Sequence, residues 1–109
     1  MGTIADSIDV AVPRNWIKAV NRVRQVEGAY VCVTDDEITE AMKSAGSLAG
    51  VFAEPAAGAA IAGVKRAVAD GVIDAGADVL AVVTGNGLKD IKTAMAIAGK
   101  PIEVDVDGA

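Results

Sequence analysis

Apolar residues in the first third of the chain follow two different spacings. Trp16, Val20 and Val23 recur at helical intervals after Asn15, which is a favourable residue for capping a helix. Residues 29–33 (AYVCV) instead form a continuous apolar run, which is typical of a strand buried on both sides. The pattern predicts a helix with one buried face, followed by a short buried strand.

A second helix is expected to begin at Thr34. Glu37 follows Thr34 at the spacing of a capping box, and acidic residues favour the positive end of a helix. We interpret this acidic start as helix-capping chemistry and not as a catalytic pair of carboxylates. The predicted helix ends near Gly50, and its apolar face is formed by Ile38, Ala41, Met42 and Ala45.

The remainder of the chain alternates between helical and extended patterns. Pro55 is suited to the first turn of a third helix, which stops at Gly71, and a short fourth helix ends at Gly99. Strands or extended segments are expected at residues 51–53, 77–84 and 101–106, and the last of these is a candidate edge strand.

Helices that alternate with strands imply parallel strands joined by right-handed crossovers. We therefore predict the α/β class, as a three-layer-type parallel sheet with helices, formed by a single domain over residues 1–109. Residues 3–12 carry apolar side chains without a helix cap, and they are expected to form an extended arm that lies on another surface.

Composition narrows the function classes. The net charge is −5 and the chain has no histidine, which argues against nucleic-acid binding and removes the commonest metal ligand, so we expect no metal site. The most apolar stretch, residues 51–64, contains Glu54 and Pro55 and is too short for a bilayer span, and no signal peptide is recognisable. We expect a soluble, cytoplasmic protein with no membrane contact, in which Cys32 is a buried, inert thiol.

Residues 82–90 (VVTGNGLKD) place a hydroxyl where a strand is expected to end. In open α/β sheets, ligands bind beyond the carboxyl ends of the strands, which makes Thr84 a candidate binding residue. The alternative is that Thr84 merely ends the strand and that residues 85–87 turn the chain, because Gly and Asn tolerate positive φ.

A second candidate segment precedes and begins the third helix. Gly58 and Gly63 each disfavour a helix by about 1 kcal/mol relative to alanine, so their presence indicates a close approach to the backbone. The approaching group is either another helix or sheet, or a flat ligand.

The two segments together resemble threonine synthases. Residues 54–60 (EPAAGAA), followed about two dozen residues later by residues 84–90 (TGNGLKD), are similar to two motifs near the C-terminus of this pyridoxal-phosphate family, which has the tryptophan synthase β-like fold. Three shorter stretches also resemble the archaeal version of the family: residues 3–8 (TIADSI), 12–16 (VPRNW) and 34–38 (TDDEI). The resemblance covers essentially the whole chain.

Threonine synthases convert O-phosphohomoserine and water into threonine and phosphate. The resemblance implies that Thr84 and Gly85 contact the cofactor, with the Thr84 hydroxyl facing the pyridine nitrogen, and that Glu54 and Ala56 lie beside the ring. A neutral hydroxyl can donate a hydrogen bond to an unprotonated ring nitrogen. Asn86 stands where many bacterial relatives carry a histidine.

Two parts of such an enzyme have no counterpart in the sequence. The Schiff-base lysine and the loop that binds the cofactor phosphate are not recognisable, so no catalytic residue is assigned and we expect the chain to be inactive alone. The implied partners are a missing N-terminal part or subunit, a small-molecule substrate, and a second copy through self-association. The chain is then a truncated gene product, an excised segment or a split subunit.

Three rival interpretations remain open. One is a related serine or threonine dehydratase with the same cofactor. Another is a stand-alone module that binds a small anion or regulates another protein, with backbone amides of the Gly-Asn-Gly turn as the ligands. The third is a structural remnant that self-associates through exposed apolar patches.

Overall fold

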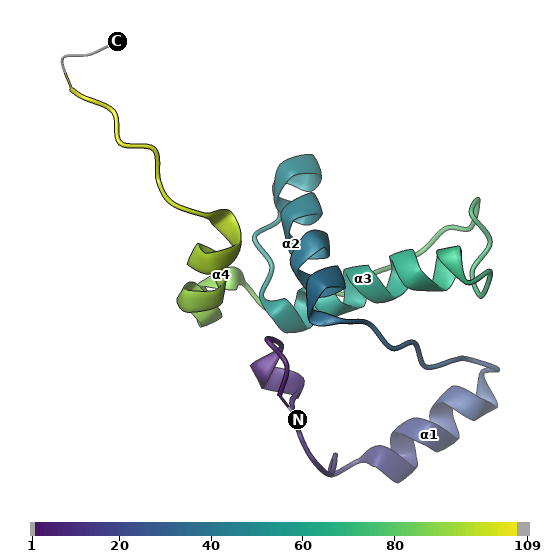
Figure 1. Cartoon of the computed structure of the whole chain (residues 1–109). Coiled ribbons are helices and arrows are strands. Elements are labelled where there is room, and N and C mark those ends of the chain that lie inside the picture. Colours follow the sequence, from purple (N-terminus) through teal and green to yellow (C-terminus); the bar gives the residue numbers. More distant parts are fainter. Residues whose placement is uncertain (1, 107–109) are drawn as a thin grey trace.

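The computed structural model describes residues 2–106, and every regular element in that range is helical. Two long helices form its centre, one shorter helix contacts them, and another lies apart from them (Figure 1). In chain order the elements are η1 (Asp6–Ile8), α1 (Trp16–Gln25), α2 (Asp35–Ala49), α3 (Pro55–Ala69), η2 (Gly87–Asp90) and α4 (Ile91–Ala98).

Helix α2 begins and ends at the residues that its sequence predicts. The Glu37 amide donates to Thr34 Oγ1 over 3.3 Å and the Thr34 amide donates to Glu37 Oε2 over 2.7 Å, which completes the capping box. Gly50 closes the helix in the left-handed conformation, with φ of 65°. The predicted apolar face is confirmed, since Ile38, Ala41, Met42 and Ala45 are the buried residues of this helix.

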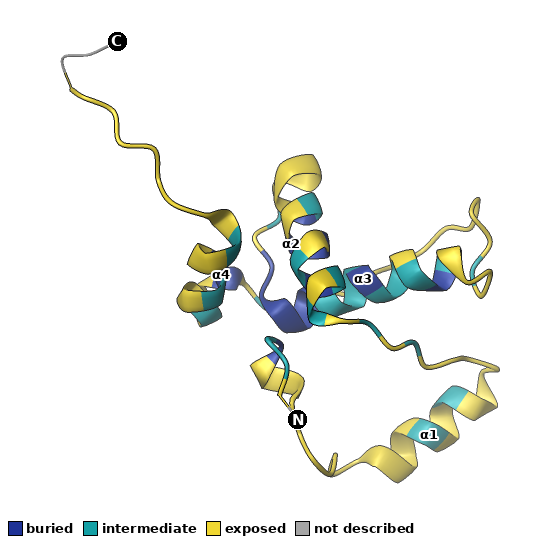
Figure 2. Ribbon diagram, in the orientation of Figure 1, coloured by how far each residue is buried: buried dark blue, intermediate teal, exposed yellow. Residues whose placement is uncertain are grey.

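Helix α3 packs against α2 at Gly58. A β-carbon added to Gly58 would lie 2.7 Å from Met42 Cγ and 3.3 Å from Ile38 Cγ2, so only glycine allows this approach. Burial is accordingly concentrated in the first turns of α3 and on the facing side of α2 (Figure 2). Gly58 therefore serves a helix–helix contact, whereas a β-carbon at Gly63 would meet nothing within 4 Å among the described residues.

The N-terminal arm lies across the start of α2. Thr3 Oγ1 donates to Asp35 Oδ1 over 2.5 Å and the Ile4 amide donates to Asp35 Oδ2 over 3.2 Å, and Ala5 is buried with Ile38 and Met42. The prediction of a purely extended arm is wrong, because a 3-10 turn, η1, interrupts it at Asp6–Ile8.

The segments expected to be strands are extended but unpaired. Within residues 2–106 the β-pairing consists of one isolated antiparallel bridge, between Ala53 and Asn86. Residues 29–33, 77–84 and 101–106 form no ladder with one another. A strand requires a neighbour that satisfies its backbone groups, and the described part of the chain supplies none to these segments. The parallel sheet therefore stays a prediction.

Two expectations about burial are wrong for the same reason. Helix α1 has no buried residue, and Trp16 is about half exposed, because α1 lies apart from the α2–α3 pair (Figure 1). The Asn15 side chain makes no capping hydrogen bond. Cys32 is exposed, because the apolar run around it finds no sheet to pack on in the described range.

The molecule is more extended than a self-contained domain of its size. Its radius of gyration is 16.7 Å, whereas a compact domain of this length has about 13 Å. Its accessible surface is 8520 Å², against about 5,600 Å² expected from its mass. None of the helices formed by residues 2–106 combines the length and the hydrophobicity that a membrane span requires.

Candidate functional site

The two segments that the sequence singles out meet in space. The Glu54 amide donates to the Gly85 carbonyl over 3.0 Å, and the Gly87 amide donates to the Phe52 carbonyl over 3.0 Å. These two hydrogen bonds form the antiparallel bridge between Ala53 and Asn86. The entry to α3 and the Gly-Asn-Gly segment are thus one unit, which we call the bridge site (residues 52–54 and 84–90).

Space, and not backbone conformation, requires the two glycines of the bridge site. A β-carbon on Gly85 would overlap the Glu54 carboxylate, and one on Gly87 would overlap the Phe52 ring. Neither glycine has a positive φ, so the alternative in which they turn the chain through that conformation is not supported. Each glycine instead lets a side chain of the facing segment pack directly on the backbone.

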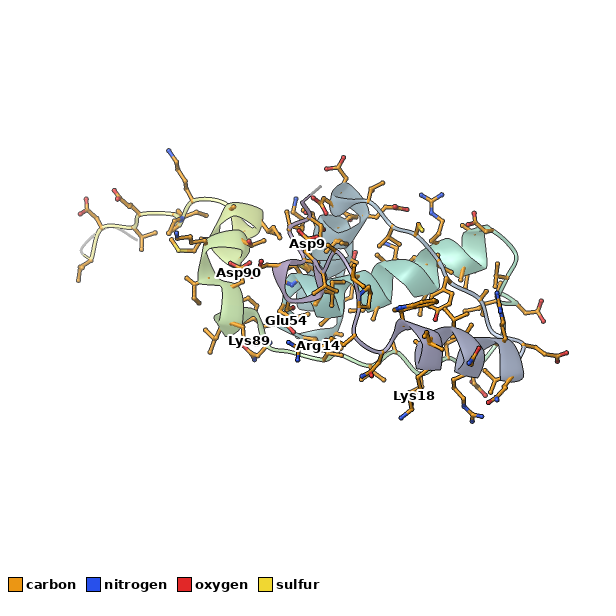
Figure 3. The ribbon with its side chains drawn as sticks, turned by 90° about the horizontal axis from the view of Figure 1, so that it is seen from below. Asp9, Arg14, Lys18, Glu54, Lys89 and Asp90 are labelled. Atoms are coloured by element: carbon orange, nitrogen blue, oxygen red, sulfur yellow. The ribbon has the colours of Figure 1, made fainter. Side chains whose placement is uncertain are left out.

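Glu54 carries a buried carboxylate at the start of α3. Only 6% of its side chain is exposed, and its Oε2 lies 3.0 Å from Nζ of Lys89, whose side chain is 60% exposed. Figure 3 labels the two residues near one another; Glu54 directly precedes α3 and Lys89 lies in η2. A buried carboxylate is stable only when a positive or hydrogen-bonding partner compensates it, and Lys89 is that partner.

Two further polar residues shape the backbone of the bridge site. Asn86 Oδ1 accepts from the Leu88 amide over 2.9 Å and caps η2, and Asp90 Oδ1 accepts from the Thr93 amide over 3.1 Å and caps α4. Hydrogen bonds from the side chain and the backbone of Thr93 lower the pKa of Asp90. Asn86 therefore has a local structural role here, at the position where many bacterial relatives carry a histidine.

The residues predicted to contact a ligand differ in their exposure. Thr84 is exposed and directly precedes the bridge, Gly85 is partly buried, and Glu54 is buried beside it. Ala56 is buried in the first turn of α3, which leaves little of its surface for a ligand. The structure thus brings together Thr84, Gly85 and Glu54. It also adds Lys89, to which the sequence analysis gave no role.

A polar cavity of about 330 Å³ adjoins the ion pair. It is lined by Ile4, Asp6, Ser7, Glu54, Pro55, Lys89 and Asp90. Within the described range, no group of three or more His, Cys, Asp or Glu residues is arranged to hold a metal ion.

Comparisons with known proteins point to one family. Residues 1–85 match the family described as "Pyridoxal-phosphate dependent enzyme". The chain is 40% identical over 105 residues to the threonine synthase of Mycobacterium tuberculosis strain H37Rv. The matched region covers 96% of this chain and 29% of that protein. It is 45% identical over 94 residues to the threonine synthase of Halalkalibacterium halodurans, and that match covers 86% of this chain and 27% of that protein.

An archaeal relative gives the same result. The threonine synthase of Methanocaldococcus jannaschii is 37% identical over 105 residues, covering 96% of this chain and 26% of that protein. The chain therefore spans little more than a quarter of the length of these relatives, and the resemblance to threonine synthases is confirmed over that part. Since the family match extends over most of its residues, the chain belongs to the pyridoxal-phosphate dependent enzyme family.

Proposed function

We propose that this chain forms the part of a threonine synthase-like enzyme that faces the ring nitrogen of pyridoxal phosphate. The complete protein would convert O-phosphohomoserine and water into threonine and phosphate. The observation that carries the proposal is the bridge site, because it joins the two segments that resemble the family's cofactor-facing motifs. Identities of 36–45% to threonine synthases over most of the chain support the same assignment.

In this proposal one edge of the cofactor would lie at the bridge site. Thr84 is an exposed residue, and beside it the Glu54 carboxylate packs on the Gly85 backbone in the space that a side chain would take. Pyridoxal phosphate, when bound, supplies a conjugated ring that accepts electrons from the substrate. The Thr84 hydroxyl would donate a hydrogen bond to the ring nitrogen and leave that nitrogen unprotonated. An aspartate at the same position would instead favour the protonated ring.

Other parts of the active site would come from residues outside this chain. We propose that the lysine that binds the cofactor covalently and the loop that binds its phosphate belong to the missing N-terminal part or subunit, and that this chain is inactive alone. Lys89 is already engaged by Glu54. The large exposed apolar side chains, which include Leu80, Val82 and Val83 before Thr84, are suited to packing against that part.

The structure disfavours the alternative of a small-anion module. The Leu88 amide at the start of η2 is already bound by the Asn86 side chain, and the Glu54 carboxylate lies against Gly85. The Gly87 and Lys89 amides are likewise engaged, by the Phe52 and Asn86 carbonyls, so these amides are not available as anion ligands. The dehydratase alternative uses the same cofactor and differs only in the substrate, so product analysis distinguishes it from the synthase.

The test of this proposal uses a chimera in which this chain replaces the matching segment of the Halalkalibacterium halodurans threonine synthase. Thr84→Val keeps the shape of the side chain and removes the hydroxyl. Bound cofactor, measured by its absorbance, should be retained, while phosphate release should fall by ~10- to 1000-fold, the scale for losing one hydrogen bond that strengthens as charge develops. Thr84→Asp should also be poor.

Thr39→Val is the matched control, because Thr39 lies on α2 outside the bridge site. It should leave phosphate release within about twofold of the parent chimera, since Thr39 is only half-buried and is not part of the bridge site. Thr84 would be merely a structural residue if Thr84→Val behaved in the same way as this control.

A further inference from the structure

We propose that Lys89 is a positioning residue: its ion pair with Glu54 holds the Glu54 carboxylate against Gly85 and thereby fixes the place of the Thr84 hydroxyl. This inference rests on the proposed function, in which that hydroxyl meets the cofactor ring. It assigns to Lys89 a role that is separate from any covalent bond to the cofactor.

Glu54 holds Gly85 in two ways at once. Its backbone amide donates to the Gly85 carbonyl over 3.0 Å, and its carboxylate fills the space that a β-carbon of Gly85 would need. The carboxylate stays there because Lys89 Nζ lies 3.0 Å from Oε2. Since Lys89 follows Gly85 by four residues, the ion pair closes a small ring of contacts around the Gly-Asn-Gly segment.

Burial makes the ion pair necessary. The Glu54 side chain is 6% exposed, so a Glu54 left without Lys89 would be an uncompensated buried charge or would rotate outward. Outward rotation would empty the space beside Gly85 and release the constraint on its backbone. Freeing Gly85 is the step through which the loss of Lys89 would reach Thr84.

The effect on Gly85 passes directly to Thr84. Consecutive Cα atoms are about 3.8 Å apart, so a shift of Gly85 moves the Thr84 side chain with it. A misplacement of about 1 Å in a reacting geometry can lower a rate by about 100-fold. The Lys89 side chain is 60% exposed and its ammonium group pairs with Glu54. In this proposal Lys89 therefore affects Thr84 indirectly, through Glu54.

The test compares Lys89→Met, Lys89→Arg and the control Lys92→Met in the chimera. Lys92→Met removes the same charge from α4, the element that follows, and leaves the Glu54–Lys89 pair intact. Hydrogen exchange is measured on peptides that contain the Glu54 and Gly87 amides, because these are the donors of the bridge. Lys89→Met should raise their exchange by about tenfold or more, as expected for a locally loosened segment.

The second measurement is turnover with the cofactor bound. Lys89→Met should lower kcat by about tenfold or more, with a smaller change in KM and with the cofactor absorbance retained, because a misplaced hydroxyl affects the reaction more than binding. Lys89→Arg should restore most of the loss, since arginine keeps the charge. In Glu54→Gln the carboxylate is absent, so adding Lys89→Met should have less effect than in the parent.

The inference is overturned if Lys89→Met matches Lys92→Met in exchange and in kcat. It is also overturned if Lys89→Arg fails to recover activity, or if the effects of Glu54→Gln and Lys89→Met simply add. Where Thr84→Val lowers turnover and Lys89→Met does not, the positioning role fails and the proposed function stands. Where Thr84→Val has no effect and Lys89→Met still raises exchange, the hold on Gly85 stands and the proposed role of Thr84 fails.

Discussion

Glu37 joins the start of α2 to the end of α3 with a single side chain. One carboxylate oxygen accepts from the Thr34 amide over 2.7 Å and the other from Arg66 Nε over 2.9 Å. The backbone hydrogen bond from Thr34 and the neighbouring Arg66 hold the pKa of Glu37 below its ordinary value. The spacing of Thr34 and Glu37 predicts the helix cap. The pairing of Glu37 with Arg66 could not be predicted in the same way, because it depends on how α3 crosses α2.

This pKa shift predicts a pH dependence of stability. Because the folded-state pKa of Glu37 is lowered, its contribution is complete above the unfolded pKa of about 4.3 and is lost as pH falls through the folded pKa. Glu37→Gln should therefore lower the melting temperature of the chimera at pH 7 and have a vanishing effect as the pH falls to about 2.

Thermal unfolding measured from about pH 2 to about pH 7 tests this difference, because carboxyl groups titrate within that range. Glu40→Gln on the same helix is the control, and it should change the melting temperature little at any pH. A gap between parent and Glu37→Gln that stayed constant down to the lowest pH would contradict the assignment.

At the scale of elements, the helices follow from local signals in the sequence, whereas a sheet depends on neighbouring strands and stays a prediction. The signals for α2 and α3 are local: the Thr34 capping box, the left-handed Gly50 and Pro55 at a first turn. A strand exists only with a neighbour, and residues 77–84 find none in the described part of the chain. The Glu54–Lys89 pair was missed because no local spacing links Glu54 to Lys89, although a glutamate before a buried, proline-started helix indicates that a cation is needed.

The α2–α3 contact predicts opposite effects for two similar substitutions. Gly58→Ala should destabilise the chimera by ~1–3 kcal/mol, because the new methyl group would meet Met42 and the Ile38 backbone. Gly63→Ala on the same helix should stabilise by ~0.5–1 kcal/mol, because none of residues 2–106 would lie within 4 Å of the new methyl group and alanine favours a helix. Chemical unfolding followed by circular dichroism measures both, and equal effects would show that Gly58 is not the contact point.

At the scale of the whole molecule, apolar surface is the dominant feature. The exposed large hydrophobic residues extend from Ile8 to Val106, and the total surface exceeds the expectation for a compact domain by about half. Such a surface is suited to contact with more protein, which agrees with a chain that spans little more than a quarter of its relatives' length. The composition indicates an apolar interior, but it does not show that many of the large apolar side chains are exposed in this chain.

The isolated chain should therefore associate with itself or unfold easily. Analytical ultracentrifugation over a range of concentrations should show oligomers, and thermal unfolding should begin at a low temperature, because no large side chain among residues 2–106 is fully buried. The same segment inside the chimera serves as the control and should show neither behaviour. A monodisperse monomer with a high melting temperature would contradict this expectation.

The bridge between Ala53 and Asn86 has a topological consequence for the molecule. It closes a loop that contains all of α3 and the exposed return segment at residues 70–83. A protease cut in that segment would leave Glu54 and Thr84 on separate polypeptides. Their meeting would then depend on the effective concentration that the remaining contacts impose, as for any two tethered modules. The return segment is thus the covalent tether that keeps the two motifs in register.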